Sequence, residues 1–395
     1  MILLKGHGAP TKDRPGNVGD IYLDEDSGLK YECTDIIVDK QHYPFLTVLA
    51  RKRNNTEYVW EKPFDIADAE SFKNFYSSSS GIVTIPELDT SKGVIFRRMF
   101  YDCVDLTSIP ELDTSKGLDF NNMFSGCSSL TSIPELDTSK GLDFSRMFYD
   151  CSSLTSIPEL DTSKGLDFDG MFSYCSSLTS IPELDTSNGL YFTSMFSSCS
   201  SLTSIPELDT STGTSFSSMF SSCSSLTSIQ KLDTSKGLDF NNMFSGCSSL
   251  TSIPELDTSK GLDFGGMFSS CSSLTSIQKL DTSNGLYFTS MFSGCKALTN
   301  LYLYNIRKAI TIGYGTSYGT LLTVDSLVHT IKELCKVTSS TRLTMGTVNK
   351  AKIASLYCKV IDDTTEKIEM ELCESTDAGA ITIEEYAALK GWTIA

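Results

Sequence analysis

In the middle of the chain the same apolar positions recur every 24 residues, and no insertion interrupts this period. In a representative unit, Phe120, Met123, Phe124 and Cys127 stand at positions i, i+3, i+4 and i+7. This spacing places four side chains on one face of two helical turns. The sequence therefore predicts a short helix in each unit, with Asp119 as its N-cap.

The second half of the unit predicts an extended segment and a turn. Leu130, Ile133 and Leu136 carry the apolar side chains of the extended segment, and the Asp-Thr-Ser run at 137–139 supplies turn chemistry. A fixed period of this length marks a solenoid, in which each unit buries its apolar face against its neighbours. The predicted fold class is an α/β solenoid, a leucine-rich-repeat horseshoe of nine 24-residue units.

One cysteine occupies the same position of every unit, on the apolar stripe. We interpret these residues as a structural core column of free thiols, because their even spacing is unlike that of a disulfide scaffold. Neighbouring strands lie about 5 Å apart, which leaves oxidation open. The nine positions are Cys103, Cys127, Cys151, Cys175, Cys199, Cys223, Cys247, Cys271 and Cys295.

The segments before the repeats differ in pattern. Residues 1–65 are expected to form a small β-meander attachment module, with two alternating strand patterns within 19–33 and a third strand at 58–62. Residues 66–92 are expected to cap the solenoid and to open with a helix at 67–76.

The repeats are assigned to residues 93–308, and a connector with a C-terminal α+β domain to residues 309–395. Helical spacing of apolar residues alternates there with one short strand pattern. The predicted elements are helices at 321–337, 349–360 and 383–390 and a strand at 367–372.

Charge argues against two classes of partner. The formal net charge is −17, of which −11 falls on residues 81–320. Such a surface repels phosphate backbones and anionic lipid, so we expect no nucleic-acid partner. The sequence has no window of 18 uninterrupted apolar residues and no signal-peptide core at residues 1–10, so neither a membrane span nor an export signal is expected.

Two segments of the unit, Met123–Ile133 and Leu136–Ser139, resemble the repeats of BspA-like leucine-rich-repeat surface proteins. The resemblance covers about residues 81–304. It implies a curved solenoid on a cell or particle surface with an adhesive or recognition role, and it brings no catalytic residues.

Both ends of the chain resemble bacteriophage proteins. The Gly-Asp-Ile-Tyr-Leu-Asp layout at 19–24 is similar to modules near the ends of phage tail and head fibres, and the run at 343–352 resembles the C-terminal segments of phage-encoded BspA-like proteins. This resemblance implies a fibre or receptor-binding protein of a virion.

The sequence offers little catalytic chemistry. The repeats contain no histidine, and the chain has no Walker or H-E-x-x-H motif, so we expect no enzyme, no cofactor and no metal. Stacked aspartates from Asp89 to Asp281 raise the alternative of calcium binding. Their Asp-Thr-Ser context favours turn chemistry, and Lys231 and Lys279 replace glutamate in two units, which relieves like-charge stacking.

Positions between the fixed core residues change from unit to unit, and we expect them to face solvent. They form either a recognition surface or a set of neutral substitutions, and the sequence leaves both open. The extended segments, by contrast, repeat Thr-Ser-Ile-Pro-Glu-Leu, so a ligand of that face would itself be repetitive, such as a glycan. The candidate recognition residues are Arg97, Arg98, Asn121, Asn122, Arg146, Asp169, Thr193, Asn241, Asn242 and Thr289.

The function we expect is that of a bacteriophage head or tail fibre on the virion surface, binding and structural rather than catalytic. Its N-terminal module would attach to other virion proteins, and its solenoid would contact a host surface glycan or protein. The resemblance to fibres implies a trimer, and a short β module often needs partners, so we expect a homo-oligomer formed through residues 1–80. The alternatives are a BspA-like adhesin on a bacterial surface and an intracellular scaffold for protein interactions.

Overall fold

The computed structural model describes residues 71–395 except 80, 86, 314–320, 338–340 and 365–367. Towards the N-terminus it describes the backbone of short strands. These are β1 (Leu3–Gly6), β2 (Ile21–Asp24), β3 (Lys30–Glu32), β4 (Lys52–Arg53), β5 (Glu57–Tyr58) and β6 (Glu70–Ser71).

The N-terminal strands form a hairpin with a third strand added in parallel. β2 and β3 pair antiparallel, as the pattern within 19–33 predicts. β1 pairs with β2 in parallel, so the sheet β1-β2-β3 is not a meander throughout. Parallel neighbours need a crossover, which hydrophobic alternation does not reveal. β4 and β5 pair antiparallel, and most of the strand predicted at 58–62 lies outside the described residues.

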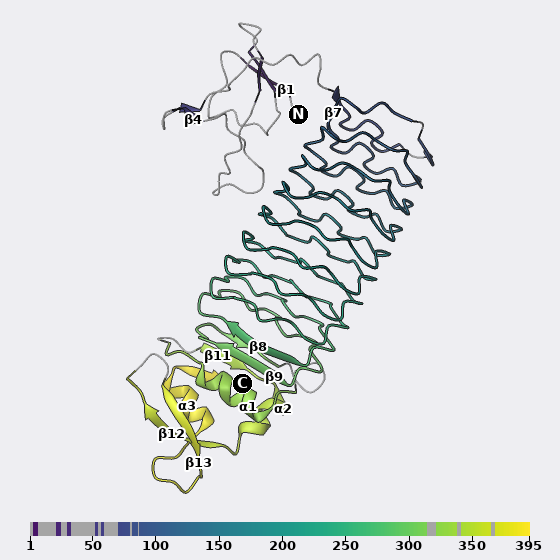
Figure 1. Cartoon of the computed structure of the whole chain (residues 1–395). Helices are drawn as coiled ribbons and strands as arrows, with labels where there is room; N and C mark the ends of the chain where they lie inside the picture. The colour runs from purple at the N-terminus through teal and green to yellow at the C-terminus, as the bar shows by residue number, and fades with distance from the viewer. Residues whose placement is uncertain are drawn as a thin grey trace.

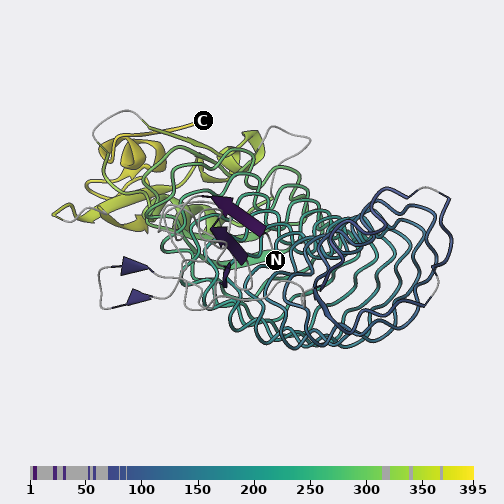
Figure 2. The ribbon, with the colours of Figure 1, turned by 90° about the horizontal axis from the view of Figure 1, so that it is seen from above.

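The middle of the chain is a solenoid. Its coils run from β6 and β7 (Gly93–Ile95) to β8 (Ser276–Asp281) and β9 (Asn300–Tyr304). Figure 1 shows the coils stacked along the long axis of the molecule, and Figure 2 shows from above that successive coils are displaced sideways, so the stack is curved. Parallel bridges join one register position of each coil to the next, from Ile95 to Tyr287.

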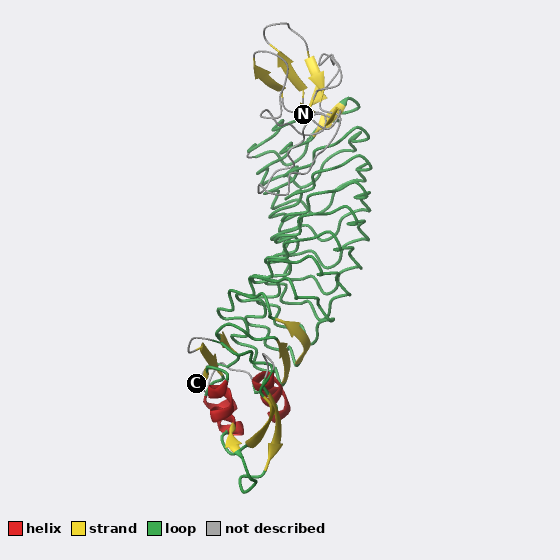
Figure 3. Ribbon diagram, turned by 90° about the vertical axis from the view of Figure 1, so that its left-hand side faces the viewer, coloured by secondary structure: helices red, strands yellow, loops and turns green. Residues whose placement is uncertain are grey.

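The short helix predicted in each unit is wrong. Residues 120–127 form a run of tight turns, and Figure 3 shows loops rather than helices throughout the coils. The N–H of Met123 donates to the carbonyl of Phe120 at 3.0 Å, whereas the N–H groups of Asn122 and Phe124 each donate to the next coil at 2.9 Å. An α-helix satisfies all these groups within one segment and would leave the coils unconnected.

Two residues of each turn run adopt the left-handed conformation. Asn122 has a φ of 56° and Gly126 a φ of 79°, and the same two positions have positive φ in the other coils. Apolar residues spaced i, i+3, i+4 and i+7 fit both a helix and this run of turns. The sequence signal for the turns was that most coils carry Asn, Gly, Ser or Asp at these two positions, four residues apart. These residues tolerate the left-handed region better than others do.

The first rung of the solenoid precedes the repeats that the cysteines mark. The N–H of Phe72 donates to the carbonyl of Ile95 at 2.9 Å and that of Tyr76 to Met99 at 2.8 Å, the pattern of every later coil. The helix predicted at 67–76 is therefore wrong in its described part.

Proline decides where the extended segments become strands. Most of them carry Ile-Pro-Glu and form no strand, because proline lacks an N–H for a ladder. β8 and β9 contain no proline and pair in parallel. The segment 228–233 also lacks proline, but it forms no strand, because the extended segments on either side of it contain Pro206 and Pro254.

The core of the solenoid consists of columns of identical side chains. The rings of Phe120 and Phe144 stack with centroids 5.7 Å apart and planes 6° apart, and Phe124 and Phe148 form a second column at 5.6 Å. Methionine, leucine and the nine repeat cysteines fill the space between them, and all nine cysteines are buried and free of disulfides. Offset stacking of this kind adds to the burial of apolar area.

The C-terminal region is α+β and covers the last coil. The N–H of Leu301 in β9 donates to the buried Ser326 Oγ of α1 at 3.1 Å, and Thr323 caps that helix. The described helices all lie in this region (Figure 3). Its elements are β10 (Ile310–Thr311), α1 (Val324–Lys332), β11 (Thr341–Thr344), α2 (Thr347–Ile353), β12 (Tyr357–Asp362), β13 (Glu369–Cys373), β14 (Ile381–Thr382), α3 (Ile383–Leu389) and β15 (Trp392–Ile394).

Two sequence predictions change here. The helix predicted at 321–337 is shorter, because α1 spans Val324–Lys332. The helix predicted at 349–360 ends at Ile353, and Tyr357–Asp362 is a strand that pairs with β13 and β14. Apolar spacing over a short segment does not separate helix from strand, and the strand partners decide. The helix predicted at 383–390 agrees with α3, which begins at a capping box between Thr382 and Glu385. In the part of the chain that is described, no helix is both long and apolar enough to span a bilayer.

Candidate binding face

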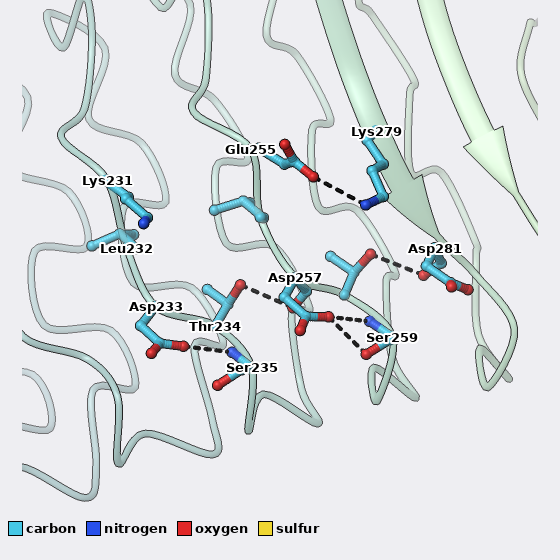
Figure 4. A pocket seen from close by; sticks show the side chains of 12 residues that line it. Lys231, Leu232, Asp233, Thr234, Ser235, Glu255, Asp257, Ser259, Lys279 and Asp281 are labelled. Atoms are coloured by element: carbon cyan, nitrogen blue, oxygen red, sulfur yellow. Dashed lines mark hydrogen bonds and ion pairs between the residues drawn. The ribbon is translucent and has the colours of Figure 1, made fainter.

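A depression of about 610 Å³ lies across three neighbouring coils, beside their extended segments. Figure 4 shows lysines and a glutamate along one side of it and a row of aspartates along the other. We call it the lysine depression. Its lining residues are Lys231, Leu232, Asp233, Thr234, Ser235, Glu255, Leu256, Asp257, Thr258, Ser259, Lys279 and Asp281.

The aspartates of the depression are held by turn chemistry. Asp257 Oδ1 accepts hydrogen bonds from Ser259 N at 3.0 Å and Ser259 Oγ at 2.7 Å. These bonds lower the pKa of Asp257, with a smaller contribution from the nearby lysines. Thr234 Oγ1 donates to the Asp257 carbonyl at 2.9 Å and so ties one coil to the next. The Asp-Thr-Ser run therefore acts as the sequence indicated.

The lysines stand where other coils carry glutamate. Lys279 Nζ lies 3.1 Å from Glu255 Oε1, and 55% of the lysine and 65% of the glutamate side chain remain exposed. The carboxylate raises the pKa of Lys279. Ion pairs this exposed contribute little to stability. The pair agrees with the interpretation that lysine relieves a stack of like charges, and it leaves both groups accessible to a ligand.

The depression is suited to binding polar groups. Neither histidine nor cysteine lines it, and the lowered pKa of Asp257 keeps that carboxylate ionised at neutral pH rather than poised to transfer protons. Ammonium groups can donate and carboxylates can accept hydrogen bonds along its length. Across the described ranges, no three His, Cys, Asp or Glu side chains gather as a metal ion would require.

The predicted recognition residues lie on the turn runs and not in the depression. Arg98, Arg146 and Thr289 are exposed, but the expectation of a solvent face is wrong for Asn122, which is 7% exposed. Its amide donates to Asn121 Oδ1 at 2.7 Å. The remaining members of the set are half-buried, namely Arg97, Asn121, Asp169, Thr193, Asn241 and Asn242.

Sequence analysis missed a column of carboxylates at the start of the turn runs. Asp119, Asp143 and Asp167 are joined coil to coil by parallel bridges. Burial raises the pKa of Asp143 to about 7, and its neighbours Asp119 and Asp167 add to the effect. About a fifth of the side chain reaches solvent, so water offsets part of it. Arg97 lies 3.7 Å from Asp119 and 3.9 Å from Asp143.

The expected cap role of Asp119 is also corrected. Its Oδ1 accepts a hydrogen bond from Asn121 N at 3.0 Å, which closes a turn two residues on rather than capping a helix. The recurrence of aspartate at this position was the signal for the column, and helix capping was the competing explanation.

The repeats match a known family. A family model described as "Mycoplasma protein of unknown function, DUF285" matches residues 69–180, 132–228, 153–252 and 214–315, more than half of the chain. The chain belongs to the DUF285 family. The matched residues coincide with the stacked coils, and the first match begins near the first rung at Phe72.

Two solved structures are similar to the chain. One is described as the crystal structure of a T. pallidum leucine-rich repeat protein; it is 22% identical, with 48% of this chain and 76% of that chain covered and a TM-score of 0.28. The other, a leucine-rich repeat protein from Bacteroides ovatus ATCC 8483, is 17% identical, with coverages of 80% and 97% and a TM-score of 0.24. At these scores the assignment of a solenoid rests on the coils themselves. No curated protein matches the chain.

Proposed function

We propose that the chain is a binding protein without catalytic activity, and that its solenoid holds a repetitive polymer such as a surface glycan. The observation that carries the proposal is that each coil before β9 exposes a charged side chain at the position of Glu255. Lys231 and Lys279 occupy this position in the two coils on either side and line the lysine depression with Glu255. Consecutive strands of a sheet lie about 4.8 Å apart, so neighbouring coils offer the same groups at a short, regular interval.

The charge of the depression favours a ligand rich in hydroxyl groups. Lys231 and Lys279 donate hydrogen bonds, while Glu255 and the three lining aspartates accept them. The carboxylates outnumber the ammonium groups, which disfavours an anionic ligand such as a phosphate. Hydroxyl groups both donate and accept, so a saccharide satisfies both kinds of side chain.

The test uses the full chain, labelled with a fluorophore, on a panel of intact bacteria. We expect binding that is lost when the cell-surface glycans are oxidised with periodate and kept when surface proteins are digested. The double variant Lys231→Glu, Lys279→Glu restores the glutamate of other coils and should weaken binding about tenfold. The double variant Lys140→Glu, Lys164→Glu is the matched control, because it makes the same charge change at two exposed lysines outside the depression. Protease-sensitive binding or an unaffected double variant would contradict the proposal.

We further propose that the protein acts on the outside of a particle or cell, as a BspA-like leucine-rich-repeat protein. The resemblance of residues 19–24 and 343–352 to phage proteins supports a virion fibre. The resemblance of the repeats to BspA-like surface proteins supports a bacterial surface protein equally, and the family description names Mycoplasma proteins of unknown function. Immunogold labelling of a producing culture separates them: label on particles supports the fibre, and label on cells supports the adhesin. Label confined to the cell interior would support the scaffold instead.

Oligomerisation through the N-terminal residues belongs to the same proposal. Light scattering should give a trimer for the full chain and a monomer for a chain that begins at residue 70. This truncation keeps the first rung, whose Phe72 N–H bonds to the second coil, so the solenoid is left intact. A monomeric full chain, or a truncated trimer, would contradict it.

A further inference from the structure

Large side chains gather at one place on the turn runs. The segment between residues 81 and 300 contains three arginines, which fall in only two of its units. The Cζ atom of Arg98 lies 5.1 Å from the ring centroid of Tyr101, and that of Arg146 lies 5.8 Å from Tyr149. Tyr149 in turn meets the ring of Tyr174 edge-on, with centroids 5.4 Å apart. We call these five residues the Arg–Tyr patch.

The backbone beneath the patch is unfavourable for such side chains. Arg98 and Arg146 have a φ of 54°, and Tyr174 has a φ of 65°. Other coils place Asn122, Gly170 or Gly266 at the arginine position, and Gly126, Gly246 or Gly294 at the Tyr174 position. A bulky residue in the left-handed region is an outlier, and such outliers persist mainly at functional sites.

The neighbouring coil makes room for the patch. A β-carbon on Gly170 would lie 3.2 Å from Arg146 Cγ and 3.8 Å from Tyr149 Cδ2. Glycine at this position therefore lets the arginine and the tyrosine of the preceding coil lie against the backbone of the next one. Tyr174 keeps 48% of its surface exposed despite its contact with Tyr149.

Arg146 lies near enough to Asp167 and Asp169 to lower the pKa of both carboxyls, but the charged groups of the patch, and Asp102 and Asp150 beside it, meet few partners at bonding distance. Among the described residues, neither Arg98 nor Arg146 forms an ion pair, and the exposed carboxylates of Asp102 and Asp150 accept no side-chain hydrogen bond. Two guanidinium groups and two carboxylates thus accompany three aromatic rings. Together the four charges cancel.

We propose that the Arg–Tyr patch is a binding site for an uncharged, hydroxyl-rich saccharide. The hydroxyl groups of a sugar accept from Arg98 and Arg146 and donate to Asp102 and Asp150, and its apolar face packs on a tyrosine ring. Tyr101 and Tyr149 lie two coils apart, about 10 Å, so the site spans more than one sugar ring. This proposal is separate from the lysine depression and does not depend on it.

Two other ligand classes fit less well. An anionic polymer would meet Asp102 and Asp150 and the net charge of −17. A protein partner usually covers about 800 Å² on each side around an apolar centre. Beyond the patch the same edge carries only small residues, such as Ser197, Ser221 and Ser245. The compact patch therefore matches a short stretch of polysaccharide.

The experiment is affinity electrophoresis of the full chain in native gels that contain a polysaccharide. The neutral probes are dextran, mannan and laminarin, and polygalacturonate is the acidic one. The test variants are Tyr174→Gly and Arg146→Gly, which restore the glycine found at these positions in other coils and so should fold at least as well. The controls are Tyr287→Ser, which removes an exposed tyrosine outside the patch and restores Ser215 of another coil, and Ser222→Gly.

We expect at least one neutral probe to retard the wild-type chain and both controls. Tyr174→Gly and Arg146→Gly should lose the retardation by about tenfold in apparent affinity while their melting temperatures stay the same or rise. No retardation by any neutral probe, retardation by polygalacturonate alone, or unchanged test variants would overturn the proposal. The Lys231→Glu, Lys279→Glu variant should be retarded like the wild type, so failure here and failure of the proposed function are distinguishable.

Discussion

The thiol of Cys127 donates a hydrogen bond to the carbonyl oxygen of Phe100 in the preceding coil, at 3.0 Å. The cysteines of the following coils repeat this contact, and burial raises the pKa of every thiol in the column. Since the thiolate is the reactive form, the column should be chemically inert in the folded protein.

The native chain should therefore react slowly with a thiol reagent such as DTNB at Cys103 to Cys295. Cys373 is half-exposed and should react first among the described cysteines. All 13 should react once the chain is unfolded in guanidinium. Peptide mapping after brief alkylation identifies the sites. Rapid labelling of the column in the native state would contradict the packing.

Gly165 is glycine because an aromatic ring leaves no room for a side chain there, and its backbone conformation does not require glycine. A β-carbon there would lie 2.5 Å from Phe168 Cζ and 3.0 Å from Phe144 Cδ2. Gly165→Ala should lower the free energy of unfolding by about 1–3 kcal/mol, the usual cost of overpacking. Thermal or urea denaturation measures the change. Phe168→Leu removes the contacting atom, so adding Gly165→Ala to it should cost less; an equal cost in both backgrounds would assign the effect to the backbone instead.

Asp143 should make the stability depend on pH near neutrality. Its pKa is about 7 in the folded chain and near 3.8 when unfolded. Between these values the folded state holds a proton that the unfolded state has lost, so stability falls as pH rises from about 4 to about 7. The groups that face the carboxyl are Asp119 and Asp167, which raise its pKa, together with Ser145 and Arg97.

Asp143→Asn should therefore melt at a higher temperature than the wild type at pH 8, and the difference should shrink at pH 5. The amide keeps an oxygen for the two hydrogen bonds from Ser145. Asp137→Asn is the control, because a hydrogen bond from Ser139 lowers the pKa of Asp137 and its effect belongs at acid pH. Scanning calorimetry across pH 4–9 makes the comparison. Equal melting curves for Asp143→Asn and wild type at pH 8 would contradict the buried charge.

Deletion of one whole period should leave a folded solenoid. Removing residues 177–200 joins two equivalent positions, because each coil contacts only its neighbours. The variant should unfold cooperatively, and small-angle X-ray scattering should show a molecule about 5 Å shorter. Deleting only half a period, at 177–188, should abolish folding, since it places the extended segment of one coil on the turn run of the next.

The sequence by itself determined that the chain is a solenoid, where its coils repeat, and which side chains fill the core. A fixed period with Phe, Met, Cys and Leu at constant positions admits little else, because each unit is too small to bury its apolar face alone. The same pattern indicated the turn chemistry of Asp137 and Ser139, which depends only on neighbours in sequence.

Only the tertiary structure decided how those coils are hydrogen-bonded. Phe120 to Cys127 read as a helix, but every second N–H donates to the next coil, and that partner lies about one full period away in the sequence. The Arg–Tyr patch and the carboxylate column have the same origin. Arg146, Tyr149 and Tyr174 become neighbours through stacking, which places residues of different units one above another. A local pattern fixes which groups a coil presents, whereas the contacts between coils set what those groups meet.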